Sequence, residues 1–302
     1  MVFQFDRVGM ALAVGRAGRL MGLCPFQEEA DVSLPAWERG WRFVLRWWMG
    51  NRRWQARLKR GQVHGMLDEI RRVLNASKKP VLVYLAPYGI HNMQSGGSKR
   101  IIGIANVLRR RYSVFILTLS PAGTKCTVVP VAEDCCLIGI SMDDGFEKAL
   151  QERAKVAGEG FFSFADYFHL LPVFQSVLGL LGERAGAWGF ASPVAWPVVQ
   201  QYRKNGPVFY DAHDDYAQYL QSSFGCTEGR LIQRMIQLEG EALGGVDAAI
   251  YCTNRDMDEA AKRFPLHRGK MFLVPNGVDT AACRDVPPVQ ADLLRTQLGL
   301  MR

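Results

Sequence analysis

The segment between residues 80 and 121 constrains the fold more than any other part of this 302-residue chain. It begins with an apolar run at 81–85, which is too short for a helix and has the β-branched character of a buried parallel strand. A loop leads to Gly96 and Gly97, and an apolar stripe at helical spacing follows them. A second apolar run at 114–118 completes a strand–helix–strand unit. The pattern predicts a doubly wound, mostly parallel α/β sheet of the Rossmann-like type.

The glycine pair in this unit has two interpretations. Glycines let a backbone pass close to a ligand, and the helix after them offers free N–H groups to an anion. The dinucleotide fingerprint G-x-G-x-x-G is absent, however, and its turn would be tighter than this ten-residue loop. An ordinary α/β loop with two turn glycines explains Gly96 and Gly97 equally well.

Composition indicates a globular protein, with 48% hydrophobic and 22% charged residues. The seven cysteines are odd in number and scattered, and none forms C-x-x-C, so we expect reduced thiols rather than disulfides or a zinc site. Charged residues interrupt the N-terminal stretch, which therefore does not have the form of a secretory signal. The expected location is cytoplasmic.

The net charge of +8 is confined to the start of the chain. Residues 1–80 carry 15 Lys and Arg but 7 Asp and Glu, whereas 22 of each sign cancel in the rest. We therefore predict a basic, tryptophan-rich helical extension at 1–79, a Rossmann-like domain at 80–280, and the start of a linker or truncated C-terminal region at 281–302.

Five of the seven tryptophans fall within residues 37–54, on one face of a predicted helix whose other face carries arginines. Such a helix is typical of an anionic membrane interface, which would place the protein on the inner face of the plasma membrane. An accessory helix packed on the domain, with solvated arginines, is an equal alternative. Nucleic-acid binding is not expected, because no recognised fold supports it. The predicted membrane-contacting residues are Trp37, Trp41, Trp48, Arg42 and Arg46.

After the first unit, short strands are predicted at 127–131 and 136–140, and a helix at 145–156. Residues 161–181 are very apolar, but Asp166, His169 and Pro172 interrupt them. We interpret this stretch as a buried helix pair rather than a membrane span, since each polar group would be costly in lipid. His169 is interpreted as a core histidine.

An alternating strand and helix pattern then resumes, as a parallel sheet requires. The predicted strands are 187–190, 207–210, 247–252 and 271–274, and the predicted helices are 193–204, 231–243 and 256–264.

Ligands of open α/β sheets bind beyond the carboxyl ends of the strands, where the densest polar cluster here is Asp211-Ala212-His213-Asp214-Asp215. Its histidine could act as a general base, a metal ligand or a hydrogen-bond donor to a sugar. Alternatively, Asp214 or Asp215 simply caps the next helix. The D-x-D at Asp256 falls in a predicted helix that would turn its carboxylates to different sides, so no metal site is expected.

Four stretches together resemble the N-terminal domain of GT-B glycosyltransferases. The resemblance is to the large retaining family of bacterial mannosyl- and glucosyltransferases that build cell-surface polysaccharides and phosphatidylinositol mannosides. The stretches are GGSKR at 96–100, VFYDAHDD at 208–215, VDAAIYCT at 246–253 and VPNGVD at 274–279. The last is the most specific, because in that family it leads into the interdomain linker.

The resemblance implies a role for each matched residue. The backbone of Gly96 and Gly97 would approach the donor pyrophosphate, and His213 would hydrogen-bond the donor sugar in the transition state. Such enzymes retain anomeric configuration and use a nucleotide-sugar as co-substrate, without a cofactor or a metal held by D-x-D. The predicted acceptor-binding residues are Lys99, Asp211, Asp214 and Asn254.

One departure from the family is large. Its second Rossmann domain holds most of the nucleotide-sugar, yet 23 residues follow Asp279 here, against the 100–200 or so that a domain needs. We expect an acceptor-binding half for a cell-surface polysaccharide or lipid-linked acceptor, with the donor half supplied by a longer polypeptide or a separate subunit. The alternatives are a non-catalytic scaffold or regulatory partner and, disfavoured by the missing fingerprint, a nucleotide-binding oxidoreductase.

Overall fold

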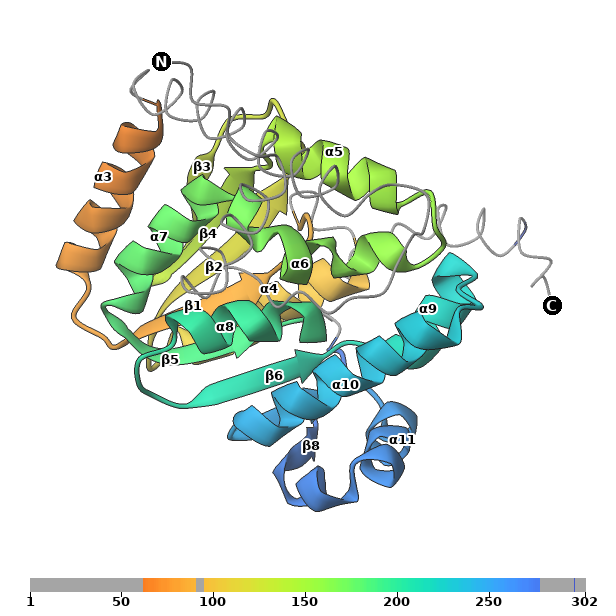
Figure 1. Ribbon diagram of the computed structural model, residues 1–302. Coiled ribbons are helices and arrows are strands. Elements are labelled where there is room, and N and C mark those ends of the chain that lie inside the picture. Colours follow the sequence, from red (N-terminus) through yellow and green to blue (C-terminus); the bar gives the residue numbers. More distant parts are fainter. Residues whose placement is uncertain (1–61, 91–94, 278–295, 297–302) are drawn as a thin grey trace, which may run out of the picture.

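The computed structural model describes residues 62–90, 95–277 and 296 (Figure 1). The predicted membrane-contacting residues between Trp37 and Trp48 lie outside the described residues, as does the region at 281–302 apart from residue 296.

The centre of the domain is an eight-stranded sheet in the order β3-β4-β2-β1-β5-β6-β7-β8. Every neighbouring pair is parallel except β3 and β4, which are antiparallel. The predicted mostly parallel α/β sheet is confirmed. The strands are β1 (Val81–Ala86), β2 (Ser113–Ser120), β3 (Thr127–Ala132), β4 (Cys135–Ser141), β5 (Ala185–Phe190), β6 (Val208–Ala212), β7 (Ala248–Tyr251) and β8 (Met271–Leu273).

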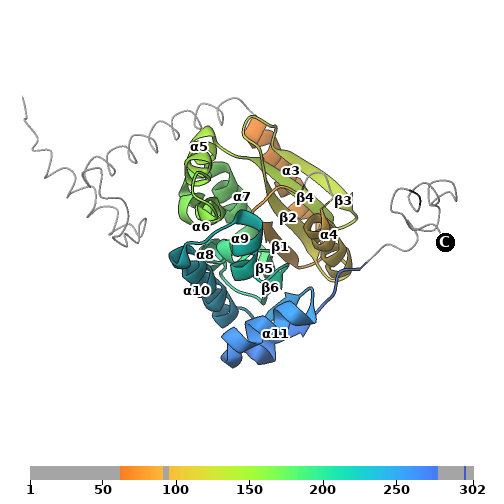
Figure 2. The ribbon, with the colours of Figure 1, turned by 90° about the vertical axis from the view of Figure 1, so that its right-hand side faces the viewer.

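Helices cover both faces of this sheet. In Figure 2, α4 lies on one side of the strands and α8 and α10 lie on the other. The α-helices of the described residues are α3 (Gln62–Ala76), α4 (Gly96–Leu108), α5 (Asp144–Arg153), α6 (Ser163–Tyr167), α7 (Pro172–Gly182), α8 (Trp196–Tyr202), α9 (Tyr216–Phe224), α10 (Gly229–Gly245) and α11 (Asn254–Arg263).

The chain reverses its direction of travel across the sheet between β1 and β5. From β1 it moves outward through α4 to β2, whereas from β5 it moves the opposite way through β6 and β7 to β8. Right-handed crossovers therefore place the helix of the first unit and those of the second on opposite faces. In doubly wound sheets this reversal is the switch point at which ligands bind, beyond the carboxyl ends of the strands.

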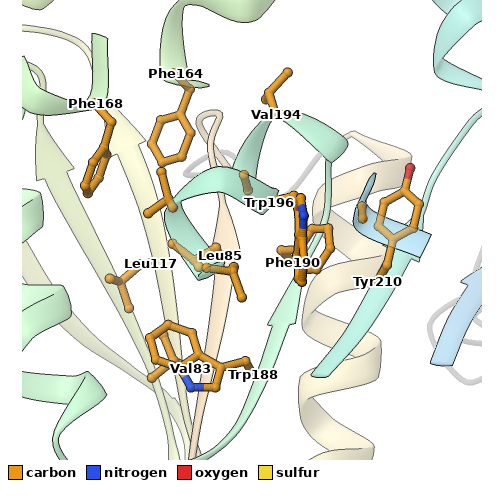
Figure 3. Close-up of a cluster of buried hydrophobic side chains, with 14 of the residues drawn as sticks. Val83, Leu85, Leu117, Phe164, Phe168, Trp188, Phe190, Val194, Trp196 and Tyr210 are labelled. Carbon is orange, nitrogen blue, oxygen red and sulfur yellow. The ribbon is translucent and has the colours of Figure 1, made fainter. Parts of the chain in front are cut away.

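The two faces of the sheet explain why its central strands are apolar throughout. Every residue of β1 and β2 is buried, because alternate side chains enter opposite layers. Val83 and Leu85 face the larger layer with Trp188, Phe190 and the aromatic side chains of α6 and α8 (Figure 3). Leu82 and Tyr84 face α4 instead, where Ile101 and Ala105 pack on them.

The apolar stretch predicted as a buried helix pair packs into the larger layer. Phe164 and Phe174 come from the two sides of its break, are 3% and 0% exposed, and contact each other edge to face. In the part of the chain described, no single helix has the length and apolarity to cross a membrane. One pair of helical segments bent by 76°, Glu159–Leu170 with Pro172–Gly182, is long and apolar enough when the two are taken together, by length and composition alone.

The larger layer also includes α3, which belongs to the segment predicted as an N-terminal extension. Its apolar face presents Val63, Met66, Ile70 and Leu74, all at most 7% exposed, to the core. Helix α3 contacts α7 and the edge strand β3. This amphipathic pattern, with apolar residues three and four apart, explains why the helix packs on the sheet.

Candidate functional site

Helix α4 begins at the sheet edge where β1 ends, as the glycine loop predicts. Ser95 caps it: its hydroxyl accepts a hydrogen bond from the Ser98 N–H at 3.1 Å. The N–H groups of Gly96 and Gly97 precede the first hydrogen bonds within the helix, so this terminus can bind an anion. Gly96 is exposed and Gly97 is half-buried, so the two glycines differ in their surroundings.

The carboxyl end of β6 supplies the second part of the site. Asp211 lies within the strand and is fully buried, whereas the His213 side chain just beyond it is 9% exposed. Asp215 is the N-cap of α9 and accepts hydrogen bonds from the Ala217 and Gln218 N–H groups. Of the two predicted caps, Asp215 is therefore the actual one, and Asp214 is exposed.

Asp211 binds three side chains from separate elements. Its Oδ1 accepts a hydrogen bond from Arg100 Nε of α4 at 2.7 Å, within an ion pair whose side chains are 3% and 0% exposed. Its Oδ2 accepts from the Tyr84 hydroxyl of β1 and lies 2.9 Å from His213 Nε2. We call these four residues, Tyr84, Arg100, Asp211 and His213, the Asp211 cluster.

The Asp211 carboxylate is ionised in this environment. Burial alone would raise its pKa, but the hydrogen bond and charge of His213, together with the Arg100 guanidinium and the Tyr84 hydroxyl, hold the pKa below its ordinary value. An ionised carboxylate only accepts hydrogen bonds, so His213 Nε2 carries a proton toward Asp211.

The other ring nitrogen of His213 faces Tyr88 and the start of α4. Nδ1 lies 3.1 Å from the Tyr88 hydroxyl. Burial and the nearby carboxylates raise the pKa of Tyr88 well above its ordinary value, so the phenol keeps its proton and can donate it to Nδ1 when the ring carries its proton on Nε2 alone. Both ring nitrogens thus have a partner, which fixes the plane of the ring.

Gly97 makes this arrangement possible. A Cβ at position 97 would lie 3.0 Å from His213 Nδ1, 3.4 Å from Cε1 and 3.8 Å from the Tyr88 hydroxyl. The missing side chain lets the helix terminus approach the imidazole. Gly96 has nothing within 4 Å of the same position, so its side faces open space. The structure brings Gly97 and His213 together across the switch point, as the sequence pattern predicts.

A third glycine, on the strand between Tyr84 and Asp211, makes room for the ring of Phe209. Gly189 of β5 pairs with Tyr84 of β1 on one side and with Phe209 of β6 on the other. The Phe209 ring fills the space of the missing side chain, because a Cβ on Gly189 would lie 2.3 Å from its Cζ. The Tyr84 and Phe209 rings meet edge to face, with centroids 5.3 Å apart.

Arg100 also binds the chain that leaves β8. Its Nη1 donates to the Val274 carbonyl at 2.5 Å and to the Asn276 Oδ1 at 3.1 Å. These residues belong to the P-N-G segment that the resemblance assigns to the start of an interdomain linker. The guanidinium therefore joins the end of β8 to the Asp211 cluster.

Two further predicted site residues, Lys99 and Asn254, lie at the same sheet edge but outside the Asp211 cluster. Lys99 is exposed on the first turn of α4, and Asn254 is exposed as the first residue of α11. Asp211, by contrast, is buried, and its carboxylate is taken up by Tyr84, Arg100 and His213. Contact of any of these residues with an acceptor stays a prediction.

The D-x-D aspartate Asp256 has a structural role. It accepts a hydrogen bond from the hydroxyl of Thr253, the N-cap of α11, and its own N–H donates to that hydroxyl. Across residues 62–90, 95–277 and 296, no group of three or more His, Cys, Asp or Glu side chains is placed to hold a metal ion.

A separate cavity of about 250 Å³ lies at the end of β4. Ser141 and Asp143 line it together with the apolar side chains of Leu171 and Phe174. In the strand order, β4 is four positions away from β6, so this cavity is distinct from the Asp211 cluster.

Sequence reasoning missed Tyr84, Tyr88 and Arg100. Tyr84 reads as one apolar residue of a buried strand, and Arg100 as a solvated cation on a helix. Arg100 lies one residue before Ile101 and five before Ala105, spacings that do not share a helix face, so the apolar stripe of α4 gives no sign that Arg100 is buried. Its partner, 111 residues away, leaves no mark in the local pattern.

Comparison with solved structures identifies this architecture. Sucrose-phosphate synthase from Thermosynechococcus elongatus matches with a TM-score of 0.50 at 15% identity, over 74% of this chain and 53% of its own. The fold is of the GT-B type. Other matches include the alpha,alpha-trehalose 6-phosphate synthase of Burkholderia multivorans, with a TM-score of 0.42 at 11% identity over 73% of this chain and 55% of its own. Anabaena HepE in complex with UDP has a TM-score of 0.41 at 13% identity, over 72% and 50%.

The present chain spans about half the length of these GT-B proteins. Comparisons with protein-family models and with curated proteins find no match. At these identities the likeness concerns the fold alone.

Proposed function

We propose that this domain is the acceptor-side half of a retaining, nucleotide-sugar-dependent glycosyltransferase. The observation that carries the proposal is the contact between Gly97 and His213 at the switch point of a GT-B-type sheet. A helix terminus able to bind phosphate and a histidine oriented by a buried carboxylate converge there, which is what a sugar linked to a diphosphate requires.

The two halves of this site would act on different parts of the donor. The N–H groups of Gly96 and Gly97 would hydrogen-bond the diphosphate, whose negative charge grows as the sugar–oxygen bond breaks. His213, held by Asp211 and Tyr88, would hydrogen-bond the sugar as positive charge develops at its ring. Lys99, Asp214 and Asn254, exposed along the same edge, would contact the acceptor. The proposed acceptors are cell-surface polysaccharides or lipid-linked glycans.

The rest of the donor site is proposed to lie in a second Rossmann-like domain, carried by a longer polypeptide or by a partner subunit. Support comes from the coverage, since the chain spans 53% of the matched sucrose-phosphate synthase. The intact mass of the native polypeptide distinguishes the two arrangements. A mass above 33.8 kDa places the donor half in the same chain, and a mass of 33.8 kDa directs the search to a co-purifying subunit.

A transfer assay on the native protein tests the function. The polypeptide, purified with its partners, receives radiolabelled hexoses linked to UDP, GDP or ADP, with lipid and polysaccharide fractions of its own cells as acceptors. His213→Ala is expected to lower transfer about 10²- to 10³-fold, since it removes one preorganised transition-state hydrogen bond. His267→Ala, in the turn before β8, is the matched control. The anomer of the product reports retention or inversion.

A non-catalytic scaffold predicts a different outcome. Unchanged transfer in His213→Ala, or no transfer from any donor in the presence of all co-purifying partners, would refute the transferase proposal. The domain would then be assigned as a scaffold or regulatory partner.

We further propose that the segment at 37–54 holds the protein on anionic membrane at the inner face of the plasma membrane. The support is the tryptophan face and arginine face read from the sequence. Because α3 packs into the core, the test keeps the full chain and substitutes Trp41 and Trp48 by Ala, or Arg42 and Arg46 by Glu. Both variants should lose sedimentation with anionic liposomes, and wild-type binding by both would refute the proposal.

A further inference from the structure

Arg100 occupies an unusual position between two parts of the site. Its side chain is 3% exposed and lies between β6 and the end of β8. Nε donates to the Asp211 carboxylate, and Nη1 donates to Val274 and Asn276. A guanidinium presents these donors in one rigid plane, so the two sets of acceptors share a single geometry.

The orientation of His213 depends on the same plane. Asp211 Oδ1 binds Arg100 while Oδ2 binds His213 Nε2 at 2.9 Å, so one rigid carboxylate links the guanidinium to the imidazole. Rotation of the Asp211 carboxylate about its axis would break one of these contacts. The chain from Asn276 through Arg100 and Asp211 to His213 is therefore continuous, and each link is a hydrogen bond of 3.1 Å or less.

We propose that Arg100 is a positioning residue that couples the segment after β8 to the His213 ring. Displacement of Val274 and Asn276 pulls on Nη1, turns the guanidinium and releases Asp211, which frees the ring to leave its Nε2–H tautomer. Under the proposed transfer function, on which only the catalytic consequence rests, His213 is oriented when the segment leading out of β8 is seated against α4.

Two substitutions address the two ends of this chain of contacts. Arg100→Lys keeps the charge but loses the planar fork, so the ammonium cannot serve Asp211 and Val274 together. Asn276→Ala removes one acceptor at an exposed position and leaves Asp211 untouched. Asn276→Asp retains an oxygen acceptor and serves as the conservative rescue. Arg234→Lys, in a separate ion pair with Asp166, is the matched control.

The readout is the pair of ring nitrogen resonances of His213 in the full chain labelled with ¹⁵N-histidine. The resonances are assigned by their loss in His213→Gln. Wild type, Asn276→Asp and Arg234→Lys should show one tautomer with the proton on Nε2. Arg100→Lys and, to a smaller extent, Asn276→Ala should move both resonances toward the average of two tautomers.

Wild-type resonances in Arg100→Lys would overturn the positioning role. A change in Arg100→Lys with wild-type resonances in Asn276→Ala would overturn the coupling to the segment after β8. In the transfer assay, Arg100→Lys should lower kcat about ten- to a hundredfold with KM little changed, the loss expected for a misplaced group. Absence of transfer in wild type would refute the proposed function alone, because the ring resonances do not depend on turnover.

Discussion

A side chain at position 97 would collide with the ring of His213, because a Cβ on Gly97 would lie 3.0 Å from Nδ1. The neighbouring Gly96 has no atom within 4 Å of its corresponding position. The two glycines begin the same helix, so they form a matched pair in which one substitution disturbs His213 and the other does not.

Gly97→Ala should displace the His213 ring by a few tenths of an ångström and weaken its hydrogen bond with Tyr88. The expected result is a change in the ring resonances of His213 in the free protein and a loss of transfer of about tenfold or more. Gly96→Ala should leave the free protein unchanged and weaken binding of the nucleotide-sugar if the backbone approaches the diphosphate. Identical spectra of the two variants would contradict the contact.

Asp211→Asn should be strongly destabilising. It leaves the Arg100 guanidinium buried without its anionic partner, a change that costs about 3–5 kcal/mol of unfolding free energy. Asp214→Asn, at an exposed position three residues along, should stay within about 0.5 kcal/mol of wild type. Urea denaturation at pH 7 measures both, and equal midpoints would contradict the prediction.

The same residue predicts an acid limb in the stability of the wild-type protein. The folded-state pKa of Asp211 is below its ordinary value, so the unfolded chain binds the proton more readily. The stabilisation is complete well above the ordinary pKa of about 3.9 and is lost as the pH falls through the folded value. Asp211→Asn should lack this contribution, so its stability should change less with pH below about 4.

The raised pKa of Glu239 predicts a pH dependence of stability with the opposite sign. Burial raises the pKa of this α10 carboxyl to about 7, in spite of the Arg263 guanidinium that it shares with Asp215. The folded state therefore binds the proton more tightly than the unfolded chain, whose value is near 4.5. Stability should fall as the pH rises from about 4.5 through 7, by about 3 kcal/mol from this group.

Glu239→Gln should remove that fall. The difference in unfolding free energy between the variant and wild type should shift in favour of the variant as the pH rises from 5 to 8. Glu241→Gln, exposed on the same helix, supplies the control and should run parallel to wild type. Parallel curves for Glu239→Gln and wild type would show that Glu239 does not carry the effect.

Gly189→Ala tests how tightly the strands pack under the site. Its new methyl group would enter the Phe209 ring, at 2.3 Å from Cζ, so overpacking should cost about 1–3 kcal/mol. Combining it with Phe209→Ala should cost less than the sum of the single changes, because the second removes the clash. A Cβ at Gly179 in α7 would have no atom within 4 Å, so the effect of Gly179→Ala on the free energy of unfolding should be neutral or stabilising. Additive costs would contradict the contact.

The parallel sheet was predictable because its signals are local. Runs such as 81–85 carry apolar residues on both faces, and glycine or polar residues follow each strand. The convergence of Gly97 and His213 followed from one rule, that the carboxyl ends of parallel strands meet at one edge. The sequence offered Asp214 and Asp215 as alternative caps of α9, because two adjacent aspartates are equally suited to that position.

The Asp211 cluster was not predictable, because its contacts are long-range. Tyr84 reaches Asp211 over Gly189, and nothing within β1 distinguishes it from a tyrosine that packs in an apolar core. Arg100 likewise has the sequence context of a surface cation. Burial of a charge is decided by its partner, and that partner is set by the order of the strands rather than by neighbouring residues.

The large sequence separation between Arg100 and its partners has a consequence for the folding of the chain during its synthesis. Its carboxylate partner is 111 residues away and its carbonyl partner is 174 residues away. At a synthesis rate of roughly 5–20 residues per second, Val274 is added roughly 10–35 s after Arg100. Throughout that interval, helix α4 lacks the contact that Arg100 makes with the chain leaving β8. The contact of Arg100 with Val274 can therefore form only after β8 has been synthesised.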